Sequence, residues 1–202
     1  MKKLFLLLIP VLISFSAFSQ DTAKDFFTSG NEKFYAADFA GAVKDYDQVL
    51  KYEPKHVVTL TNRGVAKDRL QNYRGAIEDF TKAISINPKH AEAWASRGLS
   101  KYNLKDYRGA ILDFNKAVEL NPKMAKAFNN RGLARYGLKD FSGAVADYTK
   151  AILLKSNYGE AYYNRGAPKY NLGDKAGACA DWTKAKSLGV KDADTYLKNY
   201  CK

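Results

Sequence analysis

The stretch WASRGLSKYNLKD, which runs from Trp94 to Asp106, occurs four times in this 202-residue chain with small changes. The other copies are LTNRGVAKDRLQN from Leu60, FNNRGLARYGLKD from Phe128 and YYNRGAPKYNLGD from Tyr162. An Arg-Gly pair stands at the same point of each copy, and successive pairs are 34 residues apart. A constant period of this length is typical of a repeat protein, so the repeat is the unit in which we analyse the sequence.

Residues 20–190 hold five repeats, whose places we number from 1 to 34. Place 8 is always Gly, place 20 is always Ala and place 24 is always aromatic. Places 4, 8 and 11 share one helix face, and so do places 20, 24 and 27, so each repeat is predicted to be a hairpin of two helices of roughly 13 residues. The repeats span 23–56, 57–90, 91–124, 125–158 and 159–190.

Prolines close the first three repeats, and the residue before a proline avoids helical angles. They are Pro54, Pro88 and Pro122. A single hairpin cannot bury both of its apolar faces, so neighbouring hairpins are expected to stack into a solenoid. Residues 191–202 follow the last repeat, and we predict an amphipathic capping helix there.

This pattern resembles the tetratricopeptide repeat (TPR) family from Ala23 to about Val190. The resemblance implies an all-α fold, a right-handed superhelical solenoid of five helical hairpins, here followed by the C-terminal capping helix. Place 7, usually apolar in the family, is Arg in four repeats, and place 11, usually Tyr, is Lys or Arg in all five. Pro168 lies inside a predicted first helix, where we expect a local kink or a lost hydrogen bond.

The resemblance also implies a concave groove, lined by the first helices, that binds a peptide or a helix of another protein. Asparagine amides at place 6 could donate to and accept from a peptide backbone, or they could simply be polar residues on an exposed face. Aromatic residues at place 12 could line the groove or pack within the repeat. The predicted groove residues are Asn62, Asn130, Asn164, Ser96, Phe27, Phe34, Leu99, Tyr102, Leu133, Tyr136, Tyr163 and Tyr170.

An aspartate column at place 23 offers partners for the arginines at place 7, because a half-buried charge is costly alone. Asp45 belongs to repeat 1, which has Ser29 in place of the Arg. Pairing within a repeat would leave Asp45 without a partner, so we expect each Asp to pair with the Arg of the next repeat, while pairing within a repeat remains the alternative. The expected pairs are Asp45 with Arg63, Asp79 with Arg97, Asp113 with Arg131, and Asp147 with Arg165.

Residues 1–19 have the anatomy of a secretory signal peptide: Lys2 and Lys3, then an apolar run, then small residues before Gln20. An uncleaved anchor is the alternative. Export would place Cys179 and Cys201 in an oxidising compartment, so we predict a disulfide between them, against the alternative of two free thiols. The predicted location is the periplasm of a Gram-negative bacterium, or else secretion, with no transmembrane segment in the mature chain.

No enzyme, cofactor or metal site is expected. The only two histidines, His56 and His90, are 34 residues apart and have no ligand-spaced neighbours. The net charge of +12 allows contact with anionic partners, but the basic residues are spread along the chain and nucleic acid is not expected. The predicted function is a protein-binding scaffold; the alternatives are an electrostatic binder of anionic envelope polymers or membrane surfaces, and a permanent subunit of a larger envelope complex.

Overall fold

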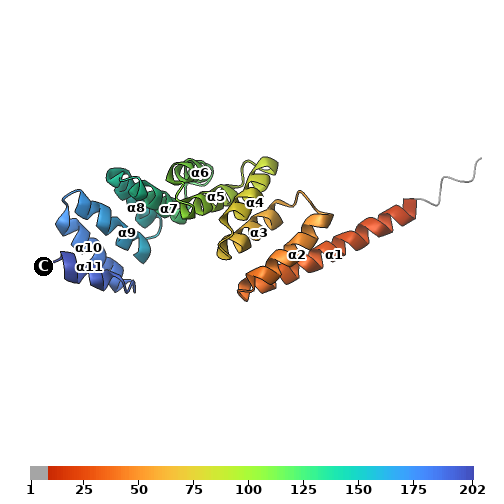
Figure 1. Cartoon of the computed structure of the whole chain (residues 1–202), viewed down its shortest axis with the longest axis horizontal. Helices are drawn as coiled ribbons and strands as arrows, with labels where there is room; N and C mark the ends of the chain where they lie inside the picture. The colour runs from red at the N-terminus through yellow and green to blue at the C-terminus, as the bar shows by residue number, and fades with distance from the viewer. Residues whose placement is uncertain (1–8) are drawn as a thin grey trace, which may run out of the picture. The chain divides into compact units, whose positions relative to one another are not determined.

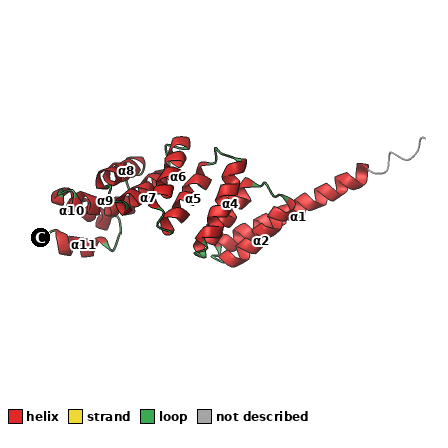
Figure 2. Cartoon of the chain, turned by 45° about the horizontal axis from the view of Figure 1, so that its top comes forward, coloured by secondary structure: helices red, strands yellow, loops and turns green. Residues whose placement is uncertain are grey.

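The computed structural model describes residues 9–202, with side chains from Thr22 onward, and all regular secondary structure in that range is α-helical. Short loops join the helices (Figure 2). The chain divides into two compact units, Met1–Pro88 and Lys89–Lys202, and each is described by itself.

The first unit contains repeats 1 and 2, each a pair of helices in close contact (Figure 1). Ala42 and Tyr46 of the first hairpin and Ala66 of the second form a buried cluster, so the two hairpins share a core. The helices of this unit are α1 (Ile9–Tyr35), α2 (Phe39–Tyr52), α3 (Val57–Arg69) and α4 (Tyr73–Ile86).

The second unit contains repeats 3 to 5 and a final short helix. One core cluster joins Phe114 of repeat 3 to Ala134 of repeat 4, and another joins Phe128 of repeat 4 to Ala161 of repeat 5. The helices are α5 (Ala91–Asn103), α6 (Tyr107–Leu120), α7 (Ala125–Gly137), α8 (Phe141–Leu154), α9 (Gly159–Asn171), α10 (Lys175–Ser187) and α11 (Ala193–Tyr200).

The predicted helical hairpins are confirmed, with helices of 13 or 14 residues after α1 in all five repeats. The second helices α2, α4 and α6 end two residues before Pro54, Pro88 and Pro122. Helix α9 continues through Pro168, which is fully buried at place 10. Since proline has no N–H, the expected loss of one helical hydrogen bond follows from its chemistry.

Every second helix begins with the same cap. An Asp or Asn at place 16 accepts a hydrogen bond from the backbone N–H of the Gly at place 19, three residues later. This side-chain oxygen satisfies one of the backbone donors that a helix start leaves without a partner. The caps are Asp38, Asn72, Asp106, Asp140 and Asp174.

Glycine at place 8 makes room for the aromatic ring at place 24 of the same repeat. A Cβ on Gly64 would lie 2.6 Å from a ring carbon of Phe80, and one on Gly132 would lie 2.8 Å from the ring of Tyr148. The ring is the nearest neighbour of this Gly, because it fills the space between the two helices of the hairpin.

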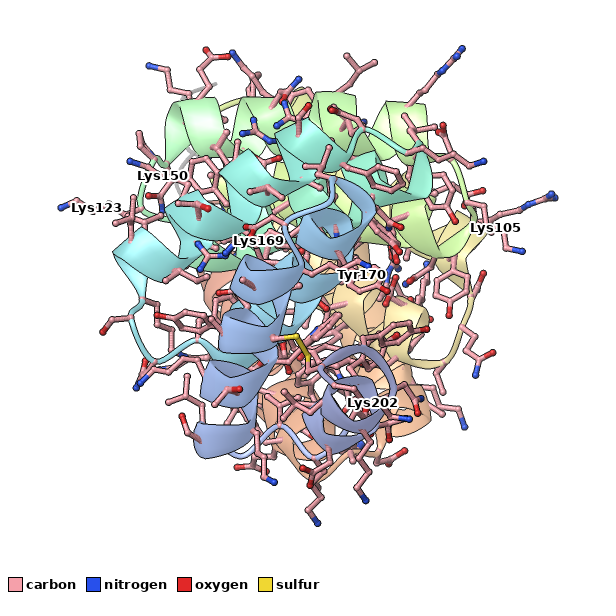
Figure 3. All side chains as sticks on the ribbon, turned by 90° about the vertical axis from the view of Figure 1, so that its left-hand side faces the viewer. Lys105, Lys123, Lys150, Lys169, Tyr170 and Lys202 are labelled. Carbon is pink, nitrogen blue, oxygen red and sulfur yellow. A yellow bond between two sulfur atoms is a disulfide. The ribbon has the colours of Figure 1, made fainter. Side chains whose placement is uncertain are left out.

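The predicted capping helix is confirmed as α11, which packs antiparallel on α10. Lys186 near the end of α10 pairs with Asp194 near the start of α11, with 2.6 Å between Nζ and Oδ1. At the other end, Cys179 and Cys201 form the predicted disulfide, with 5.7 Å between their Cα atoms. Figure 3 shows this bond in yellow between the two helices.

The predicted signal peptide, residues 1–19, lies partly outside the described residues, and for residues 9–19 only the helical backbone of α1 is described. Its presence and its cleavage therefore remain predictions. Within residues 9–202, none of the helices combines the length and the apolar character that crossing a membrane requires.

Candidate functional site

Each repeat contains a buried aspartate at place 23, and in repeats 2 to 5 two cations of the same repeat hold it. In repeat 4, Arg131 Nη2 lies 2.5 Å from Asp147 Oδ1, and Arg135 Nη1 lies 2.8 Å from Asp147 Oδ2. Asp147 is only 2% exposed, so the two guanidinium groups replace the water that its carboxylate loses. Repeats 2, 3 and 5 repeat this arrangement, with Lys at place 11 in place of Arg135.

The predicted pairing between repeats is wrong. Asp79, Asp113, Asp147 and Asp181 each pair with the Arg that precedes them by 16 residues, within the same hairpin. The reason is the antiparallel hairpin, which brings place 7 of the first helix next to place 23 of the second. The observed pairs are Arg63 with Asp79, Arg97 with Asp113, Arg131 with Asp147, and Arg165 with Asp181.

Asp45 does not lack a partner, although repeat 1 has no Arg at place 7. Lys33 Nζ lies 2.7 Å from its Oδ2, and the Ser29 hydroxyl donates to the same oxygen at 2.6 Å. Burial opposes ionisation of Asp45, but these two hydrogen bonds and the positive charge of Lys33 outweigh it, so the pKa of Asp45 is below its usual value. The basic column at place 11 was visible in the sequence and could have predicted this partner.

The arginines do link neighbouring repeats, through a residue that the sequence analysis missed. Arg63 Nη1 donates to Asp47 Oδ1 at 2.6 Å, and Asp47 occupies place 25 of the preceding repeat. In the second unit, Arg131 donates in the same way to Asn115 at 2.8 Å and Arg165 to Thr149 at 3.0 Å. One guanidinium thus holds its own hairpin together and also bonds to the one before it.

The asparagines at place 6, which we call the asparagine column (Asn62, Asn130 and Asn164), are half-buried on the first helices. In the first unit, Asn62 Nδ2 donates to Asn31 Oδ1 at 3.2 Å, and the Tyr46 hydroxyl donates to the same oxygen. In the second unit, Asn164 donates at 3.1 Å to Asn129 of the preceding repeat, and Asn129 donates to Asn130. These amides therefore form side-chain hydrogen bonds from one repeat to the next.

The aromatic residues at place 12 pack mainly against aromatic residues of their own repeat. The ring centroids of Phe34 and Phe39 are 5.4 Å apart, and those of Tyr102 and Tyr107 are 5.5 Å apart. Tyr170 packs against Trp182 of its own repeat and also against Tyr200 of α11. A packing role therefore accounts for most of this column, and Tyr136 is its one exposed member.

Three further predicted groove residues are covered by neighbouring side chains. Phe27 contacts the rings of Tyr46 and His56, and Leu99 packs against the core cluster around Phe114. Tyr163 lies edge-to-face against Tyr196 of α11. Its burial, and its contact with Tyr196, raise the pKa of Tyr163 to about 12. Ser96, the place-6 residue of repeat 3, is half-buried on α5.

A pocket of about 370 Å³ opens between repeats 3 and 4 of the second unit. Three of its lining residues, Tyr102, Leu133 and Tyr136, belong to the predicted groove set. The sequence analysis missed the other four, Tyr107, Gly137, Lys139 and Phe141, although Gly at place 13 occurs only in repeat 4 and was a readable signal. We call this the aromatic pocket.

Lysine side chains make the surface of the second unit basic. Lys105, Lys123 and Lys150 are exposed and extend away from the ribbon (Figure 3). Lys169, labelled in the same view, is different, because its ammonium group lies 2.9 Å from the buried carboxylate of Asp181. Across residues 22–202, we find no group of three or more His, Cys, Asp or Glu side chains that could hold a metal ion.

Comparison with known proteins bears directly on the repeat. Models of the tetratricopeptide repeat match residues 57–90, 91–124 and 125–158, the ranges of repeats 2 to 4. None of the curated proteins matches the sequence significantly.

Solved structures match over most of the chain. MamA protein is 27% identical with a TM-score of 0.74, over 87% of this chain and 96% of MamA. YrrB, described as a TPR protein with an unusual peptide-binding site, is 18% identical with a TM-score of 0.69, over 86% of this chain and 90% of its own. PilF of Pseudomonas aeruginosa is 18% identical with a TM-score of 0.79, over 89% of this chain and 82% of its own. At this identity, the last two support the fold alone.

Proposed function

Because this chain belongs to the tetratricopeptide repeat family, we propose that it is a non-enzymatic scaffold that binds a peptide segment or a helix of another protein along its first helices. The family and its structural relatives support protein interaction in general. YrrB, with the same fold, has a peptide-binding site, and we extend that mode of binding to this chain.

The asparagine column is the observation that carries the proposal. Each amide has two N–H donors and two acceptor lone pairs, more than the hydrogen bonds that it makes inside the chain. The bonds from Asn62 to Asn31 and from Asn164 to Asn129 hold these amides in fixed orientations. A partner backbone could then bond to the remaining donors and acceptors with little loss of side-chain entropy.

The basic surface supports a second candidate, an electrostatic binder of anionic envelope polymers or membranes. Lys105, Lys123 and Lys150 are exposed, and no ion pair with the described residues neutralises them. Such binding would weaken steeply with salt, since exposed charges are screened within about 8 Å at physiological ionic strength. A third candidate, a permanent subunit of a larger complex, would appear as self-association of the isolated chain.

We also propose that the protein works in an oxidising compartment, the periplasm or the exterior of a bacterium. The bond between Cys179 and Cys201 is the support, because disulfides persist where thiols are not kept reduced. The proposed export signal in residues 1–19 is consistent with it.

A pull-down from envelope extract with residues 20–202 tests the scaffold function. The same experiment is run with Asn62, Asn130 and Asn164 all changed to Ala, after circular dichroism has shown that this variant is folded. We expect a defined protein with the unaltered chain and at least tenfold less of it with the variant, because several hydrogen bonds of about 0.5–1.5 kcal/mol each are lost.

A matched control carries Asn157→Ala and Asn199→Ala, two exposed asparagines outside the asparagine column. It should capture as much protein as the unaltered chain. If all three proteins retain the same material and raised salt removes it, the scaffold proposal fails and the electrostatic binder takes its place.

A further inference from the structure

The walls of the aromatic pocket are two pairs of rings, one pair from each repeat. Tyr102 and Tyr107 of repeat 3 lie with ring centroids 5.5 Å apart, and Tyr136 and Phe141 of repeat 4 lie at the same distance. Both pairs are tilted, at 50° and 51°, so ring faces and edges are presented together. An aromatic guest can meet such rings edge-to-face or offset-stacked, which adds attraction beyond the area that it buries.

Gly137 is the reason why the pocket forms between repeats 3 and 4. A Cβ at this position would lie 2.9 Å from two ring carbons of Tyr107, so the ring can approach α7 only because Gly137 has no side chain. Between repeats 4 and 5, the corresponding residue is Asn171, whose amide donates to the Tyr136 hydroxyl at 3.4 Å. In repeats 1 to 3 and 5, place 13 holds Tyr35, Arg69, Asn103 and Asn171.

Lys139 gives the pocket a positive charge at its edge. Its ammonium group makes no hydrogen bond or ion pair with residues 22–202. The carboxylate of Asp140, its neighbour in the chain, accepts the backbone N–H of Gly143 at 2.9 Å and lies 3.7 Å from Arg135 Nε. Lys139 is therefore an exposed cation that a carboxylate on a ligand in the pocket could pair with.

We propose that the aromatic pocket binds an aromatic side chain of a partner peptide and that Lys139 pairs with an acidic residue next to it. The inference rests on the proposed scaffold function. It names the kind of side chain that binds at the contact between repeats 3 and 4. The volume of about 370 Å³ is at the small end of ligand pockets, which suits one large side chain.

A peptide fits the lining better than a sugar does. A sugar would bring many hydroxyl groups into the pocket, and burying them without hydrogen-bond partners is costly. The polar side-chain atoms of the lining are the hydroxyls of its three tyrosines and the Lys139 ammonium group, and it contains no carboxylate and no side-chain amide. An aromatic ring with one neighbouring carboxylate matches both the apolar wall and the single cation.

The test is a titration of ¹⁵N-labelled residues 20–202 with the peptide acetyl-Gly-Gly-Phe-Glu-Gly-Gly-amide, followed by amide chemical shifts. We expect saturable shifts centred on the amides of Leu133, Gly137 and Lys139. Replacing Phe by Ala in the peptide should weaken binding at least tenfold, as the loss of one buried aromatic side chain predicts. Replacing Glu by Gln should weaken it about threefold, as for an exposed ion pair.

Two variants of the chain locate the site, and one matched control accompanies them. Gly137→Asn introduces the residue that repeats 3 and 5 have at place 13, so the fold should persist while the pocket is filled and the shifts disappear. Lys139→Glu should weaken binding about fivefold or more. Lys105→Glu changes the same place of repeat 3, with φ of 64° against 63° at Lys139, but lies outside the lining and should leave binding within about twofold.

The proposal is overturned if the peptide causes no saturable shifts, or if both variants bind it as tightly as the unaltered chain. Binding of phosphatidylglycerol vesicles that Lys139→Glu abolishes, without peptide binding, would assign the pocket to a lipid and also overturn it. The pull-down separates this failure from that of the scaffold function. If Gly137→Asn still captures the protein that the triple asparagine variant loses, the scaffold stands and the pocket proposal alone is wrong.

Discussion

At the residue scale, the Arg-Gly pair combines two separate structural roles in adjacent positions. The Gly leaves space for the ring at place 24, and the Arg neutralises the buried Asp at place 23. Both partners belong to the second helix of the same hairpin, so the pair secures the hairpin. An unpaired buried carboxylate would cost several kcal/mol. Lys or Arg at place 11 therefore provides a second cation in repeats 2 to 5 and the one cation on Asp45 in repeat 1.

We predict that Asp147→Asn lowers the free energy of unfolding by about 3 kcal/mol, because it leaves Arg131 and Arg135 without their shared carboxylate. Urea denaturation at neutral pH measures the change. Asn115→Ala, which removes only the acceptor in the preceding repeat, should cost less than about 1.5 kcal/mol. An equal loss in both variants would contradict the view that the main contact lies within the hairpin.

At the scale of the element, the capping helix completes the last hairpin. Trp182 of α10 is 1% exposed because Tyr196 and Tyr200 of α11 pack against it, with ring centroids 5.1 and 5.8 Å away. A solenoid needs a terminal element that covers its last apolar face. The eight residues of α11 are too few to be stable as an isolated helix, so this packing and the disulfide hold it in place.

We predict that reduction of the bond between Cys179 and Cys201 destabilises the C-terminal hairpin by about 3 kcal/mol, from the entropy of the loop that the bond closes. Amide exchange in α11 should accelerate strongly when reductant is added. In a variant with both cysteines changed to Ser, exchange in α11 should be fast and indifferent to reductant. Slow exchange in that variant would show that the aromatic packing suffices without the bond.

At the scale of the whole molecule, the chain consists of two units that differ in what they contain. The second unit has three hairpins, three buried clusters and the capping helix. The described part of the first unit has two hairpins, with α1 extending upstream of the first repeat. Repeat proteins gain stability from contacts between neighbours, and about three repeats are needed for a stable fold.

We predict that residues 89–202 fold cooperatively on their own, whereas residues 20–88 alone are only partly helical. Circular dichroism and thermal unfolding of the two fragments test this expectation. A disulfide-bonded 89–202 fragment without a cooperative transition would contradict it, and would show that this unit depends on the other half of the chain.

The sequence alone was sufficient for the fold. The period of 34, with Gly at place 8 and an aromatic residue at place 24, predicts the hairpins. Helix periodicity depends on residues close together in the sequence, and the same spacing occurs in all five repeats. Pro54, Pro88 and Pro122 predicted the helix ends, because the effect of a proline on the residue before it is also local. The disulfide was also predictable, since an antiparallel cap brings Cys201 back to the start of α10.

Only the tertiary structure decided which residues of one repeat place contact which residues of another. The same columns of Asp and Arg are compatible with pairing within or between repeats, and the packing of the antiparallel helices decides for the same repeat. The aromatic pocket depends on rings from two repeats and on the missing Cβ of Gly137. Periodicity assigns a residue to a helix face, but the distance between two faces depends on the volume of every side chain packed between them.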